Sequence, residues 1–486
     1  MTTINPAIMI DGYKTGHKDQ YPENTQEVYS NFTPRNNKHF KQWKVDNNVV
    51  FFGLQYFIKD YLIKEWNDNF FSKPKNEVID EYKELLSEYL GSTQDTYHLE
   101  RLHDLGYLPI VIKAVDEGTV APIKIPLITI KNTLPDYYWL TNYLETILSC
   151  YMWLPITSAT TARQYKMLFK HYADLTSDDE GFIFYQGHDF SMRGMSSPQS
   201  AIMSGMAHLT SFTGTDTIPA IQMIKKVYGN NGDNFIIGRS VPATEHSVMC
   251  LGQKETEIDT FKRLINDVYP TGVVSIVSDT WDYWKVITEY LPELKDNILS
   301  RDGTVVIRPD SGDPVKIVCG DMYANTYHEQ LGSIQMLWKT FGGTINSKGY
   351  KVLNPKIRLI YGDGITLGIV NKILNLLKQE GFSSENIIFG IGSYSYQYVT
   401  RDTLGFAVKA TSGVVNGEKV SIFKDPKTDN GLKKSAKGLL KLDNDFVLHE
   451  EVSEQEEETG LLTTVFKNGE LIKETSFLEI IEKITL

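Results

Sequence analysis

Six short apolar runs between residues 182 and 395 each end in a polar turn. They are FIFYQGHDF (182–190), FIIGRSVPATEHS (235–247), VVSIVSDTWD (273–282), VVIRPDSGDP (305–314), IRLIYGDGIT (357–366) and IIFGIGSYS (387–395). Helix-like stretches separate these runs, and strands that carry polar residues only at their carboxyl ends are typical of a β/α barrel. The pattern therefore predicts an α/β fold with an irregular β/α barrel over residues 153–395 and its chemistry in the turns.

The two ends of the chain predict a second, mixed α+β domain made of residues 1–152 and 396–486. Helical spacing of apolar residues and strand-like runs both occur in these parts. The expected helices cover 49–66, 76–90, 136–151 and 158–172, and the expected strands cover 108–120 and 123–132, with a hairpin at 461–469.

Two segments interrupt these patterns. The later strands of the repeat begin near 273, 305, 357 and 387, and the gap between 305 and 357 exceeds the roughly 30 residues that one βα unit needs. We expect an extra excursion there, at 340–356. The acidic run HEEVSEQEEETG (449–460) is expected to be a solvated surface loop, because blocks of charge usually face water.

Length and charge limit the classes of function. A chain of 486 residues, 41% of them hydrophobic, is long enough for about two or three domains with a sizeable core. Its formal net charge of -12 disfavours binding to nucleic acid or to an anionic membrane, since both need clustered positive charge. Any anionic ligand must be held by a local basic site.

The cysteine content and the N-terminal segment favour a soluble cytoplasmic protein. The three cysteines, Cys150, Cys250 and Cys319, are far apart and form no CxxC pair, which argues against a disulfide framework or a zinc site. MTTINPAIMIDGYKTGHKDQ does not have the pattern of a secretory leader, and no window holds 18 consecutive apolar residues.

Arg308 and Asp310 flank a proline directly after one of the predicted strands. Such a pair can place a cation against a phosphate while the carboxylate takes a ribose hydroxyl or a magnesium ion. The alternative is a surface salt bridge. Asp363 in IYGDGI and Asp279 in VSDTWD repeat the arrangement on other strand ends, which favours a site that handles a sugar and a metal.

Other turns carry weaker signals. GHDFSMRG offers Phe190 for stacking on a planar ring and Arg193 for an anion, although an aromatic residue in this position is more often part of the core. Glu245 and His246 are adjacent in SVPATEHS, and neighbouring side chains on an extended segment point to opposite faces, so the two need not interact. The glycines of FGIGSYS can let backbone amides approach a phosphate.

Taken together, these segments resemble the nicotinamide phosphoribosyltransferase family, within the type II phosphoribosyltransferases. The matching stretches run in family order along nearly the whole chain: DGYKTGHKDQYP (11–22), FFGLQY (51–56), YWLTNYLET (138–146), HDF with RG and SS (188–197), GTDT (214–217), SVPATEHS (240–247), VSDTWD (277–282), IRPDSGDP (307–314), GDG (362–364), TRD (400–402), FKDP (423–426) and VFKNG (465–469). Such collinear coverage is more specific than any one motif.

The resemblance implies that nicotinamide and 5-phosphoribosyl-1-pyrophosphate react to give nicotinamide mononucleotide and pyrophosphate, in NAD salvage. The reaction would need Mg²⁺ and would take place at a homodimer interface, with ATP as a stimulating cosubstrate hydrolysed through a phosphohistidine. The residues that match the family's site are, for the base, Phe190, Asp216 and the partner subunit's Tyr13; for the ribose, pyrophosphate and catalysis, Arg193, Ser240, Ser275, Arg308, Asp310, Arg358, Gly362 and Asp363; for magnesium, Asp279 and Asp310; for the phosphohistidine, His246; and for phosphate, Gly392, Ser393, Arg401, Lys409, Lys424 and Lys433.

The chain departs from the family pattern at one place. Family members usually have a denser glycine run where this chain has Ser393 and Tyr394, which leaves the shape of the 5'-phosphate cradle open.

Two alternatives to this function stand beside it: a nicotinate phosphoribosyltransferase, and a non-catalytic scaffold of the same fold. Asp216 argues against the first, since a nicotinate carboxylate about 4 Å from an ionised Asp216 costs on the order of 4 kcal/mol at an effective dielectric near 20. That corresponds to roughly a thousandfold in affinity. The many charged site residues that the chain carries argue against the second.

Overall fold

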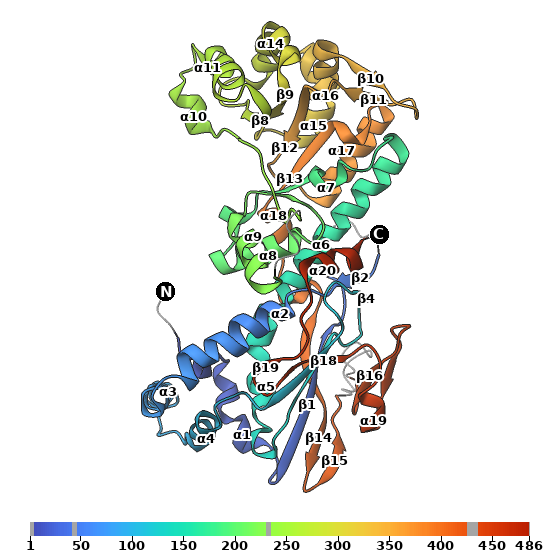
Figure 1. The fold of residues 1–486 in the computed structure, drawn as a ribbon. Coiled ribbons are helices and arrows are strands. Elements are labelled where there is room, and N and C mark those ends of the chain that lie inside the picture. Colours follow the sequence, from blue (N-terminus) through green and yellow to red (C-terminus); the bar gives the residue numbers. More distant parts are fainter. Residues whose placement is uncertain (1–3, 41–45, 230–234, 425–435, 486) are drawn as a thin grey trace.

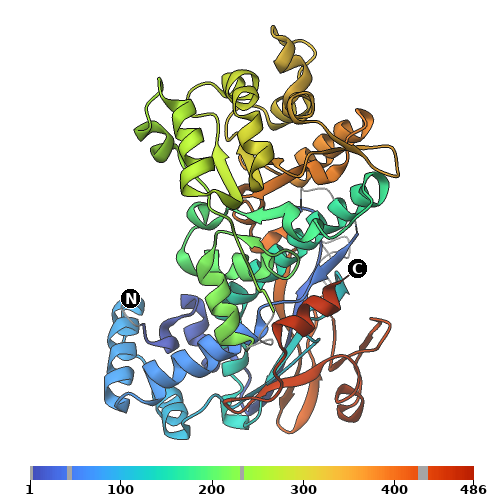
Figure 2. The ribbon, with the colours of Figure 1, turned by 45° about the horizontal axis from the view of Figure 1, so that its top comes forward.

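The protein is described by a computed structural model that covers residues 4–40, 46–229, 235–424 and 436–485. Two large sheets of different kinds lie towards opposite ends of the molecule, with the long helix α6 between them (Figure 1). The view in Figure 2 shows the same division. None of the helices in these described ranges is both long and apolar enough to cross a membrane.

The upper sheet is parallel and holds the predicted repeat. Over the described residues its order is β7-β6-β13-β12-β9-β8, and all neighbours are parallel. The strands are β6 (Gly187–Asp189), β7 (Gly214–Thr215), β8 (Thr271–Val277), β9 (Asp302–Arg308), β12 (Ile357–Tyr361) and β13 (Ile387–Ile391). Two parallel bridges, Gly214 with Arg239 and Ala243 with Ser275, connect the edge strands β7 and β8 through the segment 239–243. The sheet curls accordingly, and the predicted β/α barrel is confirmed.

Helices of the barrel pack by their apolar faces. In α17 (Leu367–Gln379) the buried residues are Leu367, Val370, Ile373, Leu374 and Leu377, which is the spacing of one helical face. The hydroxyl of Thr366 caps this helix by accepting from the backbone N–H of Ile369. The other helices between strands of the barrel are α8 (Pro198–His208), α9 (Ile218–Val227), α10 (His246–Leu251), α11 (Glu257–Arg263), α12 (Tyr283–Lys285), α13 (Leu291–Glu293), α14 (Lys295–Ser300), α15 (Pro314–Cys319) and α16 (Tyr327–Phe341).

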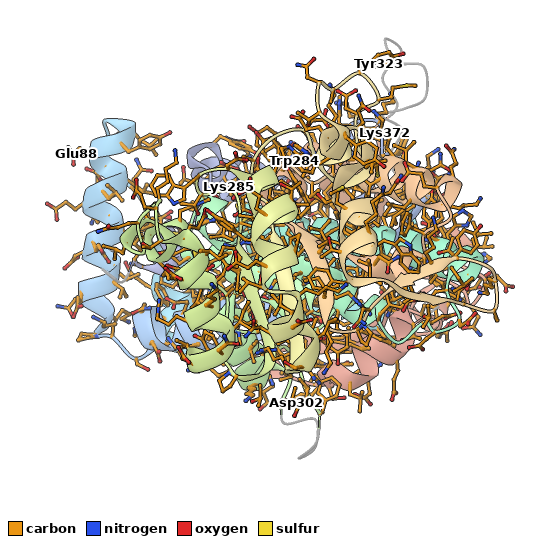
Figure 3. All side chains as sticks on the ribbon, turned by 90° about the horizontal axis from the view of Figure 1, so that it is seen from above. Glu88, Trp284, Lys285, Asp302, Tyr323 and Lys372 are labelled. Atoms are coloured by element: carbon orange, nitrogen blue, oxygen red, sulfur yellow. The ribbon has the colours of Figure 1, made fainter. Side chains whose placement is uncertain are left out.

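The predicted excursion between β9 and β12 is confirmed. It contains a small hairpin of β10 (Gly343–Ile345) and β11 (Lys351–Leu353). The connection from α15 to α16 carries Tyr323, which is 87% exposed and stands at the periphery of the molecule in Figure 3.

The lower sheet is antiparallel and takes strands from both ends of the chain. Its order is β15-β14-β1-β5-β3-β18-β19. The strands are β1 (Thr25–Pro34), β3 (Ile110–Ala114), β5 (Ile128–Asn132), β14 (Phe406–Val415), β15 (Glu418–Ser421), β18 (Thr463–Lys467) and β19 (Glu470–Leu471), and the predicted hairpin at 461–469 corresponds to β18 and β19. Helices α3 (Lys75–Leu90), α4 (Tyr97–Leu105) and α20 (Phe477–Ile484) belong to the same part of the molecule (Figure 1).

Smaller elements complete this part of the molecule. They are α1 (His17–Gln20), α5 (Leu140–Tyr143), α19 (Glu454–Glu457), and the two-stranded sheets of β2 (Asn48–Val50) with β4 (Val120–Pro122) and of β16 (Leu440–Leu442) with β17 (Leu448–Glu450).

The prediction of two helices at 136–151 and 158–172 is wrong. One helix, α6 (Glu145–Thr176), covers the end of the first and all of the second, and only short helical turns at Pro135–Tyr137 and Leu140–Tyr143 precede it. Pro155 lies inside it, where a proline costs about 3 kcal/mol relative to alanine. Pro155 packs against Gly53, and nearly all of its neighbours in α6 are buried. The hydroxyl of Thr157 donates to the carbonyl of Trp153 at 2.6 Å. Burial of both halves outweighs the local cost.

Three further predictions need correction. Residues Ile183–Gln186 form the short helix α7, so that strand β6 starts only at Gly187. The segment 235–247 makes single bridges instead of a strand over its described residues, because Pro242 cannot donate to a ladder. The predicted helix at 49–66 begins only with α2 (Leu54–Tyr56) and continues as π-helical turns, Phe57–Glu65 and Asn67–Phe71.

The acidic run is not wholly solvated. Its Glu457 is 3% exposed and pairs with Lys113 of β3 at 2.6 Å, a contact between residues far apart in the sequence.

Candidate active site

Phe190 follows β6 and lies at the carboxyl ends of β12 and β13. Its backbone N–H donates to the carbonyl of Ile391 at 3.0 Å. A Cβ at Gly390 would overlap the Phe190 ring, and a Cβ at Gly362 would lie 3.2 Å from it. The two glycines are therefore needed for space, since the ring edge rests directly on their backbone.

Asp216 stands in the loop after β7 and is held by two donors. The hydroxyl of Ser240 donates to Asp216 Oδ1 at 2.7 Å, and His188 Nε2 lies 2.9 Å from the same oxygen. Burial acts to raise the pKa of Asp216, but the bonds from His188 and Ser240 and the charge of Arg308 outweigh it, so the pKa is lowered. Asp216 is thus a carboxylate at neutral pH, and neither of these two bonds uses Oδ2.

His188 was not among the predicted site residues. It stands on β6 two residues before Phe190, and its ring centroid is 4.8 Å from that of Phe190. Residues two apart on an extended segment share a face, which is the signal that could have found it.

Asp189, between His188 and Phe190, connects the loops after β6 and β7 through buried hydrogen bonds. It is fully buried, and its two oxygens accept hydrogen bonds from the backbone N–H and hydroxyl of Ser191 and from the hydroxyls of Thr215 and Thr217. Phe190 and Asp216, the residues predicted to bind the base, therefore lie on loops with a common buried anchor.

The predicted acids of the ribose side come together at the carboxyl ends of β8 and β9. The backbone N–H of Asp310 donates to Asp279 Oδ2 at 3.0 Å, and His246 Nε2 lies 3.8 Å from Asp279 Oδ1. Burial raises the pKa of Asp310; Arg308 and His246 oppose this effect, and Asp279 and Asp363 add to it. Asp363 is therefore close enough for its charge to act on Asp310.

Arg308 and Asp310 form an ion pair at 3.5 Å, but it is not the surface salt bridge of the alternative interpretation. The Arg308 side chain is only 12% exposed. Its Nη2 donates to the carbonyl of Thr244 at 2.6 Å, and its Nε has no hydrogen-bond partner among the described residues. The Arg308 guanidinium is therefore held by one hydrogen bond and faces the Asp310 carboxylate through Nε.

The acids fit the way in which proteins bind Mg²⁺. The Asp279 side chain is 4% exposed, and its Oδ1 has no hydrogen-bond partner in the ranges that the structure covers. Across the same ranges, no three His, Cys, Asp or Glu side chains are arranged to hold a metal ion. Mg²⁺ is commonly held by one or two carboxylates together with substrate phosphates, so Asp279 and Asp310 suit a metal that arrives with the substrate.

Three further barrel residues that were predicted to bind substrate lie in different surroundings. Ser275 lies buried in β8, and its Oγ has no partner among the described residues. Arg193 is exposed in the turn Met192–Gly194, which contacts Ser393 through Gly194. Arg358 is not brought to the carboxyl ends, because its Nη1 donates to the carbonyls of Leu353, Asn354 and Ile357 near the start of β12.

Predicted phosphate-side cations lie in the antiparallel part of the same chain. Burial lowers the pKa of Lys409 on β14, and the charges of Arg35, Lys424 and Arg401 lower it further, while Glu145 raises it. These cations are thus close neighbours. Arg35 was missed by the sequence analysis, since no local motif marks it. Lys433 lies outside the described residues.

Tyr13 also belongs to this part of the chain. It is 65% exposed and precedes α1, which lies at the end of the molecule opposite the barrel (Figure 1).

Comparisons with known proteins agree with this geometry. Residues 185–470 match the model of the nicotinate phosphoribosyltransferase (NAPRTase) family, and residues 5–111 match that of the N-terminal domain of nicotinamide phosphoribosyltransferase. The chain is 49% identical to the nicotinamide phosphoribosyltransferase of Acinetobacter baylyi, covering 99% of this chain and 97% of that one. It is 38% identical to the nicotinamide phosphoribosyltransferase of Mycoplasma genitalium, covering 90% and 95%.

Solved structures show a similar fold. The crystal structure of human nicotinic acid phosphoribosyltransferase aligns with a TM-score of 0.59 at 13% identity, covering 98% of this chain and 92% of that one. A nicotinate-nucleotide pyrophosphorylase from Pyrococcus furiosus gives the same TM-score at 14% identity, covering 99% and 94%. With relatives of this identity over nearly its whole length, the chain belongs to the nicotinamide phosphoribosyltransferase family.

Proposed function

We propose that the protein transfers the 5-phosphoribosyl group from phosphoribosyl pyrophosphate to nicotinamide, giving nicotinamide mononucleotide and pyrophosphate in NAD salvage. The observation that carries this proposal is the ionised Asp216, held by His188 and Ser240 on the same rim as Phe190, Arg308, Asp279 and Asp310.

The base side suits an amide better than an acid. Phe190 offers an aromatic surface to the pyridine ring, and Asp216 Oδ2 can accept from the carboxamide N–H. Nicotinate would instead bring its carboxylate to an ionised Asp216, at a cost on the order of 4 kcal/mol. This argues against the alternative of a nicotinate phosphoribosyltransferase.

The chemistry needs no nucleophile from the protein. The pyridine nitrogen of nicotinamide attacks C1 of the ribose, and the bond from C1 to the pyrophosphate oxygen breaks, so the electron pair leaves with pyrophosphate. Positive charge develops on the sugar and negative charge on the leaving group. Arg308 and Arg193 stabilise the departing pyrophosphate, Asp310 and Asp363 orient the ribose, and Phe190 and Asp216 orient the base.

Magnesium is part of the proposal. Asp279 and Asp310 would hold it, with the metal neutralising charge on the pyrophosphate when it is bound. The buried and unpartnered Asp279 Oδ1 supports this assignment.

We further propose that the active unit is a homodimer with a site shared between subunits. Support comes from the place of Tyr13, which is exposed in the antiparallel part of the chain while Phe190 lies at the barrel rim. The partner's Tyr13 would close the base site, and Arg401, Lys409, Lys424 and Lys433 would bring cations to phosphate, some of them across the interface. Mixing Tyr13→Ala and Phe190→Ala subunits, each inactive alone, should restore up to about a quarter of the activity if sites are shared; additive residual activity alone contradicts sharing.

ATP is proposed as a stimulating cosubstrate through His246. This side chain is half exposed, and its Nδ1 lies 3.2 Å from the hydroxyl of Thr280 while Nε2 faces Asp279. A ring held from two sides but open to solvent can accept a phosphoryl group from ATP, and water then releases phosphate. His246→Ala should abolish ATP hydrolysis and leave the ATP-independent reaction measurable.

The test of the function is release of pyrophosphate from phosphoribosyl pyrophosphate in the presence of Mg²⁺. Release that requires nicotinamide, with nicotinamide mononucleotide identified by mass, supports the proposal. A preference for nicotinate would move the assignment to the other base, and no release with either base would favour a non-catalytic scaffold.

A further inference from the structure

The turn at 392–397 follows strand β13 at the rim of the barrel. Gly392 precedes the single helical turn α18 (Ser393–Tyr396) at the carboxyl end of β13. Ser393 is partly exposed and Tyr394 is exposed, whereas Ser395 and Tyr396 are fully buried. Ser395 and Tyr396 thus give the turn two buried anchors beneath it.

The first anchor is Ser395. Its Oγ lies 2.7 Å from the hydroxyl of Tyr165 on α6, and the same Oγ contacts the carbonyl of Ile365 at 3.3 Å. Tyr165 is itself fully buried, so water does not compete for these bonds.

The second anchor is Tyr396, whose hydroxyl lies 2.7 Å from Nδ1 of His208 on α8. On the other side of the ring, His208 Nε2 lies 3.0 Å from the carbonyl of Gly214. A carbonyl can only accept, so Nε2 carries the proton, and a neutral ring then accepts at Nδ1 from the Tyr396 hydroxyl. Burial lowers the pKa of His208 to about 4, in agreement with a neutral ring.

Gly214 connects this network to the base side. It belongs to β7, where it pairs with His188, and it stands two residues before Asp216. The bonds from Tyr396 through His208 to Gly214 therefore link the turn of Gly392 and Ser393 with the loop that carries Asp216. The turn also contacts the loop after β6, because a Cβ at Gly194 would overlap Ser393.

We propose that Tyr396 and His208 are positioning residues that fix the phosphate-side turn and the base-side loop relative to each other. This inference rests on the proposed function, in which Asp216 faces nicotinamide, and on the family resemblance, which implies that Gly392 and Ser393 face the 5'-phosphate. Because one buried chain of bonds serves both loops, loosening it impairs the binding of both substrates, whereas loosening Ser395 impairs only the phosphate side.

The first variant is Tyr396→Phe, which removes one hydroxyl and keeps the buried ring. We expect the KM values for phosphoribosyl pyrophosphate and for nicotinamide each to rise about five- to tenfold, the value of one buried hydrogen bond, with a smaller change in kcat. Tyr398→Phe is the matched control, because Tyr398 is 75% exposed and lies just beyond the turn. Its kinetics should equal those of the wild type.

Two more variants separate the anchors. Tyr165→Phe should raise the KM for phosphoribosyl pyrophosphate and leave that for nicotinamide unchanged. His208→Gln, whose amide can still donate to Gly214, should add little when combined with Tyr396→Phe, since both remove the same bond. Unchanged KM values in Tyr396→Phe, or additive effects of Tyr396→Phe and His208→Gln, would overturn the inference.

The protonation state of His208 in the wild type tests the network without any variant, and so does not depend on a variant folding. In wild-type protein with ¹⁵N-labelled histidine, His208 should stay neutral with its proton on Nε2 down to about pH 5. A protonated or Nδ1–H ring at pH 7 contradicts the network. Wild-type enzyme in the same kinetic assays separates the two proposals: no turnover refutes the function, while turnover with unaffected Tyr396→Phe refutes only the positioning role.

Discussion

Glu457 in the antiparallel domain and Asp279 at the barrel rim are buried to the same degree, with side-chain exposures of 3% and 4%. Their surroundings differ. Glu457 contacts the ammonium of Lys113 at 2.6 Å and the hydroxyl of Tyr29 at 3.3 Å. Asp279 accepts one backbone N–H at Oδ2, but Oδ1 has no hydrogen-bond partner among the described residues and faces His246 only at 3.8 Å.

We infer from this difference that Glu457 stabilises the fold and that Asp279 serves a ligand. A buried charge costs several kcal/mol unless a partner compensates it. Burial raises the pKa of Glu457, and Lys113 opposes that effect within the fold itself. At the rim, the described residues do not fully compensate the buried carboxylate of Asp279. In the proposed function, the substrate and its metal would supply the missing positive charge. The comparison makes activity and stability separable by mutation.

Asp279→Asn should have the largest effect on activity. We expect kcat/KM to fall about a hundred- to a thousandfold, because the variant loses the negative charge that would hold the metal at the leaving group. The free energy of unfolding should stay equal or rise, since an incompletely paired buried charge is removed. Steady-state kinetics and urea unfolding measure the two quantities, and a parallel loss of both would undo the contrast with Glu457.

Glu457→Gln should show the reverse. The buried Lys113 would then keep only the exposed Glu458, 2.9 Å away, as its anion. The free energy of unfolding should therefore fall by about 2 kcal/mol, while kcat/KM per folded molecule remains that of the wild type. The matched control is Lys113→Met with Glu457→Leu, which removes both charges and should recover most of the stability. A loss of kcat/KM in Glu457→Gln protein that is still folded would contradict a purely structural role of the Lys113–Glu457 pair.

Asp216→Ser tests an acid intermediate between these two, since it is half exposed and already held by two donors. The wild type should favour nicotinamide over nicotinate by roughly a thousandfold in kcat/KM, and the variant should reduce that ratio at least tenfold. Asp267→Ser, at an exposed position away from the rim, serves as the control. An unchanged ratio would remove Asp216 from base selection.

Glu257→Gln should give the smallest effect, visible only through its pH dependence. Burial raises the pKa of Glu257 from its ordinary value of 4.5 to about 7. Below pH 4.5 Glu257 is protonated in both the folded and the unfolded state. Between pH 4.5 and about 7 the unfolded state loses the proton while the folded state keeps it, so the wild type loses stability as the pH rises. The variant should therefore match the wild type near pH 4.5 and have the higher Tm above pH 7. Parallel Tm curves across this range would contradict the shift.

Much of the barrel could be predicted because four of its strands contain nearly continuous apolar runs, as parallel strands covered by helices do. VVSIV, VVIR, IRLIY and IIFGI therefore stand out as β8, β9, β12 and β13. The extended segment at 235–247 misled the prediction, since its bridges depend on the two sheet edges and not on its own pattern.

The continuous α6 and the buried Glu457 could not be predicted either. Both depend on tertiary partners, Gly53 for Pro155 and Lys113 for Glu457, which local propensity does not contain.

The site shows the same limit. Residues directly after strands, such as Asp310 and Asp363, could be found because parallel strands end at a common rim. His188 and Arg35 were missed, since their roles follow from contacts with Asp216 and with the cations around Lys409.

The most direct measurement is a competition in which wild-type enzyme receives equal nicotinamide and nicotinate with limiting phosphoribosyl pyrophosphate and Mg²⁺. Mass spectrometry then identifies the mononucleotide formed. The account predicts nicotinamide mononucleotide almost exclusively, with one pyrophosphate released for each. Comparable amounts of the two mononucleotides, or none of either, would contradict it.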